Sequence, residues 1–284
     1  MKAVELYQSA VHRLKDAHIE DAEIEASILL GHLLHLSRAR IFLHTEELPA
    51  PILHSFEQHL RRRLAREPLS YILEEQEFWS LPFYVNRDVL IPRPETEILL
   101  EMVLQVLKGE GRSPCSVLDM GTGSGIIAII LALSLPQSFV ASLDISFAAQ
   151  AVARKNAERH GVLGRVSFIN SDWLEGIRLA PLFDLVVTNP PYVAHETLDD
   201  LQPEVSLFEP RLALDGGRKG MEEICRFAGD LSVVLKPGGL FFMEIGFDQA
   251  PLVMDLFSSF SEFDGLTVYE DYAGLPRIFH ARRL

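Results

Sequence analysis

The stretch VLDMGTGSG, residues 117–125, joins a short apolar run to an acid and a glycine-rich loop. The apolar residues predict a buried strand that ends at Asp119. Three alternate glycines, Gly121, Gly123 and Gly125, then allow a tight turn and a close approach of a ligand to the backbone. The apolar segment that follows, IIAIILAL at 126–133, predicts a buried helix. A strand, a glycine loop and a helix in this order favour a nucleoside-binding α/β fold.

Apolar strands alternate with amphipathic helices from about residue 115 onward. The predicted strands are SVLDM (116–120), SFVASLD (138–144), RVSFIN (165–170), FDLVVTN (183–189) and LKPGGLFFMEIG (235–246). This alternation predicts a mostly parallel sheet covered by helices on both faces. Two final segments, LTVYEDYAG (266–274) and PRIFHARR (276–283), are typical of a closing antiparallel hairpin.

The N-terminal region has a different character. Residues 1–75 show helical periodicity without strand-like alternation, which predicts a small helical bundle. Aromatic and β-branched residues around a Leu81-Pro82 break predict a β-hairpin linker over 76–92. A new helix is expected to begin at Pro94, so the second domain is predicted over 93–284.

Composition and charge exclude several classes of protein. The 284 residues include 26 Lys and Arg against 40 Asp and Glu, a formal net charge of −14, which disfavours stable binding to nucleic acid. The two cysteines, Cys115 and Cys225, form no disulfide or metal motif, so we expect no metal site and a reducing, cytoplasmic location. No run reaches the roughly 18 apolar residues of a membrane span, and the N-terminus is unlike a signal peptide.

The residues around the glycine loop indicate which nucleoside it holds. Asp144 ends the next strand, 19 residues after Gly125, where it can accept hydrogen bonds from a ribose diol. Asp119 would repel a pyrophosphate but would stabilise the cationic amino-acid end of S-adenosylmethionine. The loop therefore favours this methyl donor over NAD. The alternative is a strand-to-helix turn that binds nothing. The predicted donor-binding residues here are Asp119, Gly121, Thr122, Gly123, Ser124, Gly125 and Asp144.

The tripeptide SDW, residues 171–173, follows the predicted strand RVSFIN. In a sheet of this order it lies beside the nucleoside. Asp172 can then accept a hydrogen bond from the adenine amino group, and Trp173 can cover the ring. A surface acid and a core tryptophan are an equally good interpretation of this tripeptide alone.

The stretch VVTNPPYVA, residues 186–194, ends a strand with two prolines. Its strand ends at the carboxyl edge of the sheet, where ligands bind in open α/β folds. Asn189 offers a carbonyl acceptor, Pro190 and Pro191 hold their carbonyls in fixed directions, and Tyr192 offers a ring face. Two acceptors and a ring suit a planar NH₂ group, held in line with the sulfonium methyl. A stiff turn without function is the alternative.

The motifs together resemble a known family. GTGSG followed by NPPY resembles the amino-methyltransferases, and the whole chain resembles the protein-(glutamine-N5) methyltransferases of peptide-chain release factors, the PrmC/HemK family. NPPY is shared with adenine-N6 and guanine-N2 methyltransferases, whereas IPRPETE (91–97) together with EPRLALDGG (209–217) is more specific. Further matching segments are PLSYILEEQEFW (68–79), LKPGGLFFMEIG (235–246) and DYAGLPR (271–277).

The resemblance implies a fold, a reaction and a partner. It implies a Rossmann-like class I methyltransferase domain with a seven-stranded, mostly parallel sheet, joined to a helical substrate-recognition domain. The reaction is methylation of the glutamine amide in the GGQ motif of class 1 release factors, with S-adenosylhomocysteine as the product. Asn189, Pro190 and Tyr192 are the expected catalytic residues, Asn189 to Tyr192 hold the amide, and Asn189 also contacts the donor. We expect a monomer.

Two rival functions use the same residues. A DNA or RNA amino-methyltransferase would place a flipped base in the cup of Asn189 to Tyr192. The net charge of −14 and the lack of a basic stripe count against it. A non-catalytic module that binds the nucleoside and a partner is the other rival.

Three further groups of residues have a functional and an ordinary interpretation. Arg93, Glu95 and Thr96 either close over the donor or substrate, or they cap the following helix. The basic run RRRLAR (61–66) is either a solvated helix face, which we favour, or a contact for an acidic face of the release factor. His32 and His35 have the spacing of metal ligands, but without neighbouring ligands a packing or surface role is favoured.

Overall fold

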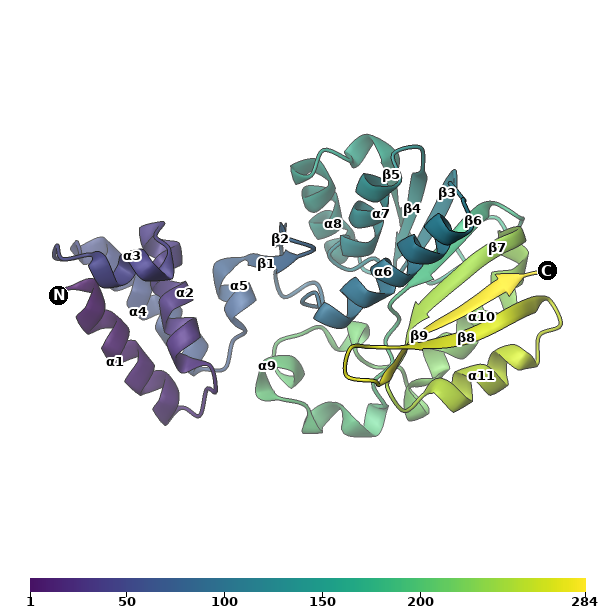
Figure 1. Ribbon diagram of the computed structural model, residues 1–284. Coiled ribbons are helices and arrows are strands. Elements are labelled where there is room, and N and C mark those ends of the chain that lie inside the picture. Colours follow the sequence, from purple (N-terminus) through teal and green to yellow (C-terminus); the bar gives the residue numbers. More distant parts are fainter. The chain divides into compact units, whose positions relative to one another are not determined.

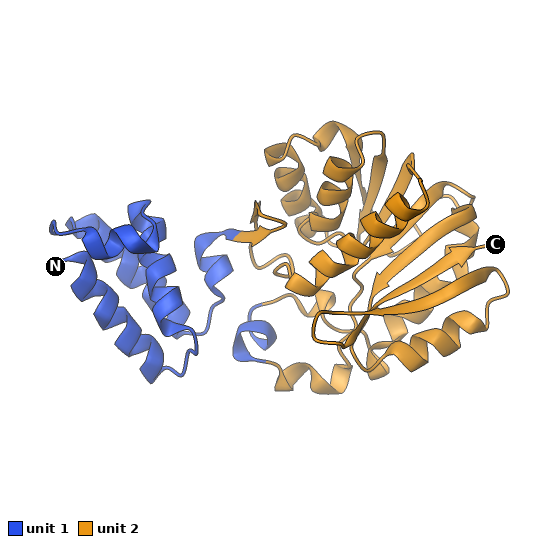
Figure 2. Cartoon of the chain, viewed as in Figure 1, with its two compact units in different colours: residues 1–75, 202–208 blue, residues 76–201, 209–284 orange.

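The computed structural model describes residues 1–284, which form two compact units (Figure 2). The helical unit comprises residues 1–75 and 202–208, and the sheet unit comprises 76–201 and 209–284. No helix has the length and apolar character needed to cross a bilayer. Nor does any cluster of three or more His, Cys, Asp and Glu side chains suit a metal ion.

The helical unit is built around one apolar core. Its helices are α1 (Ala3–Asp16), α2 (Ala22–Leu34), α3 (Arg38–Leu43), α4 (Ala50–Leu64), α5 (Leu69–Leu73) and α9 (Pro203–Ser206). The core contains Leu14 of α1, Leu29 and Leu30 of α2, and Phe56 and Leu60 of α4, all of them buried. The helical periodicity of the sequence places these residues on the inner faces of their helices, so burial of the apolar stripes stabilises the unit.

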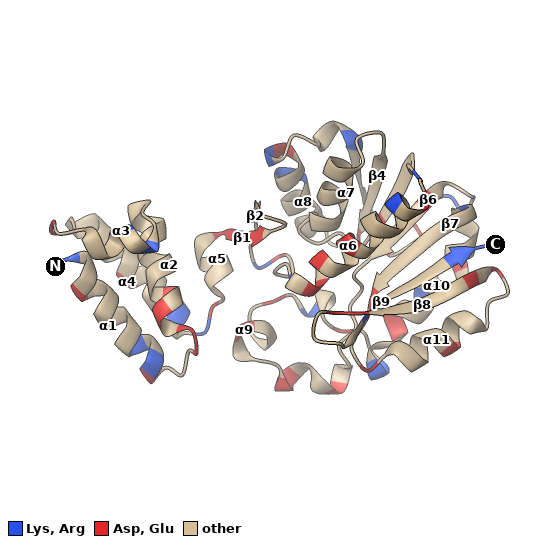
Figure 3. Ribbon diagram, viewed as in Figure 1, with Lys and Arg blue, Asp and Glu red and all other residues tan.

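The prediction that RRRLAR forms a solvated helix face is wrong for Arg63. This side chain is only 5% exposed and lies between two carboxylates, those of Glu25 and Glu204, with N–O distances of 2.6 and 2.8 Å. Arg66 also pairs with Glu204, at 2.8 Å. Figure 3 shows basic and acidic segments together in this unit. A buried charge is tolerated only when it is paired, so these arginines serve the fold of the helical unit.

Segment 202–208 belongs to the helical unit although the chain reaches it only after the fourth strand of the main sheet. Its short helix α9 carries Glu204, the residue that accepts hydrogen bonds from Arg63 and Arg66. About half of the sequence, 141 of 284 residues, therefore separates Arg63 from Glu204, and the helical unit is discontinuous along the chain.

The sheet unit contains one seven-stranded sheet in the order β5-β4-β3-β6-β7-β9-β8 (Figure 1). Its strands are β3 (Ser116–Met120), β4 (Phe139–Asp144), β5 (Val166–Asn170), β6 (Phe183–Thr188), β7 (Leu235–Glu244), β8 (Phe263–Glu270) and β9 (Pro276–Arg283). The first five of these pair in parallel, and β9 pairs antiparallel with both β7 and β8. The predicted fold, a mostly parallel sheet closed by an antiparallel hairpin, is confirmed.

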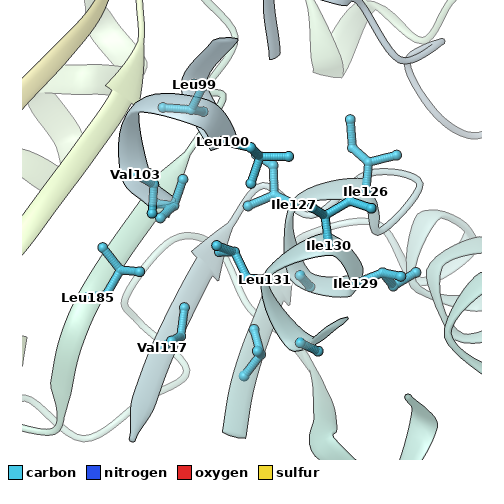
Figure 4. Close-up of a cluster of buried hydrophobic side chains, with 14 of the residues drawn as sticks. Leu99, Leu100, Val103, Val117, Ile126, Ile127, Ile129, Ile130, Leu131 and Leu185 are labelled. Atoms are coloured by element: carbon cyan, nitrogen blue, oxygen red, sulfur yellow. The ribbon is translucent and has the colours of Figure 1, made fainter. Parts of the chain in front are cut away.

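Helices cover both faces of this sheet (Figure 1). One face packs against α6 (Pro94–Gly109), α7 (Ile126–Ser134) and α8 (Phe147–Arg159), and the other against α10 (Glu222–Val234) and α11 (Ala250–Ser258). Strand residues alternate between the faces: Val117 and Leu185 lie in the first core, and Leu118 and Val186 in the second. Figure 4 shows the first core, where side chains of α6 and α7 meet those of the strands. Burial on all sides explains why α7 is apolar throughout.

Short 3₁₀ helices complete the unit: η1 (Leu163–Arg165), η2 (His195–Asp200), η3 (Arg211–Ala213) and η4 (Arg218–Gly220).

The predicted hairpin is present as β1 (Glu75–Phe78) and β2 (Leu81–Tyr84), but Pro82 lies inside β2. The turn is formed by Trp79 and Ser80, which both have positive φ, 55° and 57°, as a tight hairpin turn of matching twist requires. Asn156 of α8 fixes the end of β2, because its side chain exchanges two hydrogen bonds with the backbone of Tyr84, at 2.7 and 2.9 Å.

Acid should weaken the sheet unit through His280 of β9. This ring is 7% exposed, neither nitrogen has a hydrogen-bond partner, and it stacks on Phe242. Burial lowers the pKa of His280 to about 4, below the value of about 6.5 in an unfolded chain. The neutral ring is therefore favoured by folding, and its contribution is complete above about pH 6.5 and lost as the pH falls toward 4. We expect His280→Phe to reduce the acid slope of the unfolding free energy over this range by up to about 1.4 kcal/mol per pH unit. Denaturant unfolding at several pH values measures it, and parallel slopes for both proteins would contradict it.

Candidate functional site

A cavity of about 700 Å³ opens in the sheet unit at the carboxyl ends of the parallel strands. Its wall includes residues that directly follow β3, β5 and β6 together with the last residues of β4. Parallel strands present these ends at one edge, which is where open α/β sheets bind ligands. The residues of the wall that the sequence singled out are Gly121, Gly123, Asp144, Asp172, Trp173, Asn189 and Pro191.

The glycine loop is held against β4 and α8 by its backbone. The N–H groups of Gly121 and Thr122 both donate to the carbonyl of Leu143, at 2.9 Å. Gly125 adopts φ +87°, and a Cβ there would lie 3.0 Å from the Cβ of Ala153 in α8. Only glycine combines this backbone conformation with so close a helix. The loop thus passes directly from β3 into α7, and its residues Gly121 and Gly123 face the cavity.

Asp119 lies beneath this loop and is fully buried. One carboxylate oxygen accepts a hydrogen bond from Thr122, at 3.0 Å, and the other has no hydrogen-bond partner. Burial raises the pKa of Asp119 to about 7, the Thr122 hydroxyl lowers it, and the charge of Asp144 raises it further. A buried carboxylate with an unused acceptor is stabilised by a nearby cation, so its chemistry fits the ammonium group of S-adenosylmethionine.

Asp144 ends β4 with its carboxylate at the cavity wall. Its two oxygens accept hydrogen bonds from the N–H groups of Gly123 and Ser146, each at 2.8 Å. Burial raises the pKa of Asp144, and these two N–H donors lower it. Each carboxylate oxygen can accept a further hydrogen bond, so the fixed carboxylate can also hold two hydroxyls of a ribose.

Two residues of α10 hold Asp172 and Trp173 in place. Arg226 donates to Asp172 at 2.5 Å, and the indole N–H of Trp173 donates to Glu223 at 2.7 Å. The Trp173 ring also packs on Phe227 and lies next to Gly121. Trp173 thus packs in the core on Phe227 and also lines the cavity. Both interpretations of this residue, a core tryptophan and a wall of the nucleoside site, therefore apply.

A buried hydrogen-bond network joins Asn189 and Tyr192. The side-chain amide of Asn189 donates to the hydroxyl of Thr96 at 3.0 Å, and that hydroxyl donates to Glu244 at 2.7 Å. The phenol of Tyr192 donates to the other oxygen of Glu244 at 3.1 Å. Glu244 is the last residue of β7 and is fully buried. Burial raises the pKa of Glu244 to about 7, while the two hydroxyls lower it.

The backbone behind Pro191 and Tyr192 is closely packed. Gly220 has φ +66°, and a Cβ there would lie 2.0 Å from the carbonyl oxygen of Tyr192. The side chain of Gln249 donates to this same carbonyl at 3.0 Å. The 216–220 segment and Gln249 therefore contact the backbone of the turn that follows the two prolines, and these contacts position the cup.

The segments IPRPETE and EPRLALDGG contact each other through Glu209. This buried carboxylate accepts hydrogen bonds from Arg93, at 2.5 Å, and from the N–H of Ile91, at 3.2 Å. Burial raises the pKa of Glu209, and Arg93 lowers it. Arg93 is also the N-cap residue of α6, as the second interpretation expected, and Glu95 lies in the first turn of that helix. The Arg93 side chain makes no cap hydrogen bond and instead ties together two loops of the sheet unit.

Some predicted site residues are not part of the lining of this cavity. They are Asp119, Thr122, Ser124, Gly125, Pro190 and Tyr192. The sequence reasoning did not single out Glu223, Arg226, Glu244 or Gln249 as site residues. An acid that ends an apolar strand was a usable signal for Glu244, because the same pattern had identified Asp144. Glu223 and Arg226, three residues apart on a helix, carry no such signal.

Comparisons with known proteins give the family. Residues 5–73 match the PrmC N-terminal domain, and residues 95–205 match the methyltransferase small domain. The chain is 40% identical to a release factor glutamine methyltransferase of Caulobacter vibrioides, over 89% of this chain and 87% of the relative. It is 41% identical to one of Moorella thermoacetica, over 96% of each chain. A solved methyltransferase of Pyrococcus furiosus shares the fold, with a TM-score of 0.55, 16% identity, and coverage of 80% of this chain and 98% of that one. The resemblance inferred from the motifs is confirmed, and the chain belongs to the family of release factor glutamine methyltransferases.

Proposed function

We propose that the protein transfers a methyl group from S-adenosylmethionine to the side-chain amide nitrogen of the glutamine in the GGQ motif of class 1 release factors. The observation that carries this proposal is the network that fixes the Asn189 amide at the wall of a cavity shared with the glycine loop. Membership of the family supports the choice of acceptor.

The donor-binding residues fit this ligand in charge and shape. The loop from Gly121 to Gly125 lies against the donor, Asp144 accepts from its ribose, and Asp119 stabilises its ammonium group from beneath the loop. Asp172 and Trp173 recognise the adenine. When bound, the donor supplies a methyl group on a positively charged sulfur, and S-adenosylhomocysteine leaves after transfer.

The cup orients the acceptor. The Asn189 side-chain oxygen and the Pro190 carbonyl accept the two amide protons of the substrate glutamine, and the Tyr192 ring packs on the plane of the amide. An amide nitrogen is a poor nucleophile because its lone pair is delocalised. Acceptors that hold its protons and direct it at the methyl carbon lower the barrier by positioning and electrostatics. The proton can leave after the methyl group has been transferred.

The net charge and the free cysteines support proposals on the partner, the oligomeric state and the location of the protein. The protein acts as a monomer, its partner is a release factor, and it forms no stable complex with nucleic acid, which its charge of −14 disfavours. Both cysteines are free, which suits the reducing cytoplasm. A DNA or RNA amino-methyltransferase with a flipped base in the cup is the alternative reaction, and no feature of the cavity favours it.

Labelled methyl transfer tests this function. The purified protein is incubated with labelled donor and one of four acceptors: a release factor, the same factor with its GGQ glutamine replaced, DNA, or RNA. Label in the intact factor alone is expected. Label in nucleic acid would instead assign the cup to a base amino group, and donor binding without transfer to any acceptor would favour a binding module.

Donor affinity should depend on pH through Asp119. Since the pKa of this carboxyl is raised to about 7, the group is largely neutral at pH 6 and half ionised at pH 7. Only the ionised form attracts the donor ammonium. We expect affinity to rise about fivefold from pH 6 to pH 7, where an amino group with a pKa of about 7.7–8.0 stays mostly protonated, and the rise to be lost in Asp119→Asn. Calorimetric titration at several pH values measures the effect, and an equal rise in both proteins would assign it to another group.

A further inference from the structure

We propose that Thr96 and Glu244 are positioning residues for methyl transfer, which together fix the amide of Asn189 with its side-chain oxygen toward the acceptor nitrogen. The inference rests on the proposed function, because it assigns how the cup of that reaction is set. Neither residue lies on the cavity wall, so both act through Asn189 and Tyr192.

The direction of each hydrogen bond follows from the number of protons available. Above about pH 7, where Glu244 is ionised, its carboxylate carries no proton, so both hydroxyls that reach it, those of Thr96 and Tyr192, must donate. Having given its only proton to Glu244, the Thr96 hydroxyl can only accept. The group of Asn189 that faces it at 3.0 Å must therefore be the NH₂ and not the oxygen.

This proton order decides what Asn189 presents to the substrate. With its NH₂ held by Thr96, the side-chain oxygen faces away from Thr96, on the side of the cavity, and can accept a proton of the substrate amide. A flipped Asn189 would set its oxygen against a hydroxyl that has no proton left and would direct an NH₂ at the substrate NH₂. Both contacts are unfavourable, so the network selects the orientation that binds an acceptor amide.

Water cannot replace this network. Glu244 is fully buried and Thr96 is 1% exposed, and each comes from a different element, β7 and α6. The charges of Glu95 and Arg277 also act on Glu244, with opposite effects on its pKa. Burial of the carboxylate itself is unfavourable, so packing alone does not explain an acid at a position that an apolar side chain could fill.

The test compares two substitutions at one position. Thr96→Val keeps the shape and removes the hydroxyl, whereas Thr96→Ser keeps the hydroxyl. We expect kcat for methylation of a release factor to fall on the order of 10- to 100-fold in Thr96→Val and to stay within about threefold in Thr96→Ser. The Kd of S-adenosylmethionine, measured by calorimetry, should be unchanged in both. Glu244→Leu, which offers neither hydroxyl an acceptor, should repeat the loss of kcat.

A matched control separates positioning from packing. Thr188 of β6 is also buried, and its hydroxyl donates to the backbone carbonyl of Met120 at 2.7 Å, outside the network. Thr188→Val should lower the thermal midpoint as much as Thr96→Val without the same loss of kcat. The inference is overturned if Thr96→Val keeps wild-type kcat, if Thr96→Ser loses as much as Thr96→Val, or if Thr188→Val loses as much. If the wild-type protein itself fails to methylate the factor, the proposed function fails instead.

Discussion

Replacing Asn189 by alanine should lower kcat for methylation of a release factor by about 10²- to 10³-fold, the effect of removing one fixed polar group at a reacting centre. The reason is that the substrate amide loses the acceptor that holds its N–H and directs its nitrogen at the methyl carbon. Asn189 has its NH₂ occupied by Thr96, so its oxygen is the group that this substitution takes from the cavity. Single-turnover methylation at saturating donor and factor measures the loss.

Donor binding is the internal control for Asn189→Ala. The loop, Asp144 and Trp173 keep their own hydrogen bonds in this variant, so the Kd of S-adenosylmethionine should change less than about threefold. A variant that methylates at the wild-type rate would remove Asn189 from its assigned role. A loss of donor affinity as large as the loss of kcat would mean that the substitution disturbs the glycine loop.

Asp144→Ala should weaken donor binding by about 100-fold. Two charge-assisted hydrogen bonds to the ribose are lost, and each contributes a net of about 1.5–3 kcal/mol. A loss at the lower end, about 3 kcal/mol, corresponds to a factor on the order of 100 in Kd. The loop also loses the contact between Asp144 and the N–H of Gly123. At saturating donor, kcat should fall less than about tenfold. Calorimetry gives the Kd, and kinetics at high donor concentration give kcat.

A change of charge alone does not produce this result. Asp255 of α11 is an exposed acid of the same unit, so Asp255→Ala removes one negative charge without touching the cavity. Its donor Kd should equal that of the wild type. Equal weakening by both substitutions would point to the overall field of the protein, and unchanged binding in Asp144→Ala would remove Asp144 from the donor site.

Local sequence patterns were sufficient to predict the sheet unit. The alternation of apolar strands with amphipathic helices predicted the parallel sheet, and the apolar run 126–133 identified the buried α7. The position of the hairpin turn was wrong by a few residues, because Pro82 was taken as a break. Proline is accommodated within β2, and Trp79 and Ser80 adopt the positive φ that the turn needs.

The site was predictable where function depends on residues adjacent in sequence. The glycine loop and Asn189 are such cases, since strand ends bring them to one edge of the sheet. Thr96, Glu244 and the pair of Arg93 with Glu209 were not predictable in their roles, because each depends on a contact across more than 100 positions or between separate elements. The same holds for Arg63, whose partner Glu204 is 141 residues away.

The discontinuous helical unit has a consequence for the order in which the newborn chain folds. Arg63 leaves the ribosome 141 residues before Glu204, a delay of roughly 7–28 s at about 5–20 residues per second. During that time Glu25 alone can neutralise the arginine, and the bundle lacks α9. The unit that begins the chain is therefore completed late, after β3 to β6 have been synthesised. Synthesis thus couples the maturation of the helical unit to that of the loop that carries Asn189.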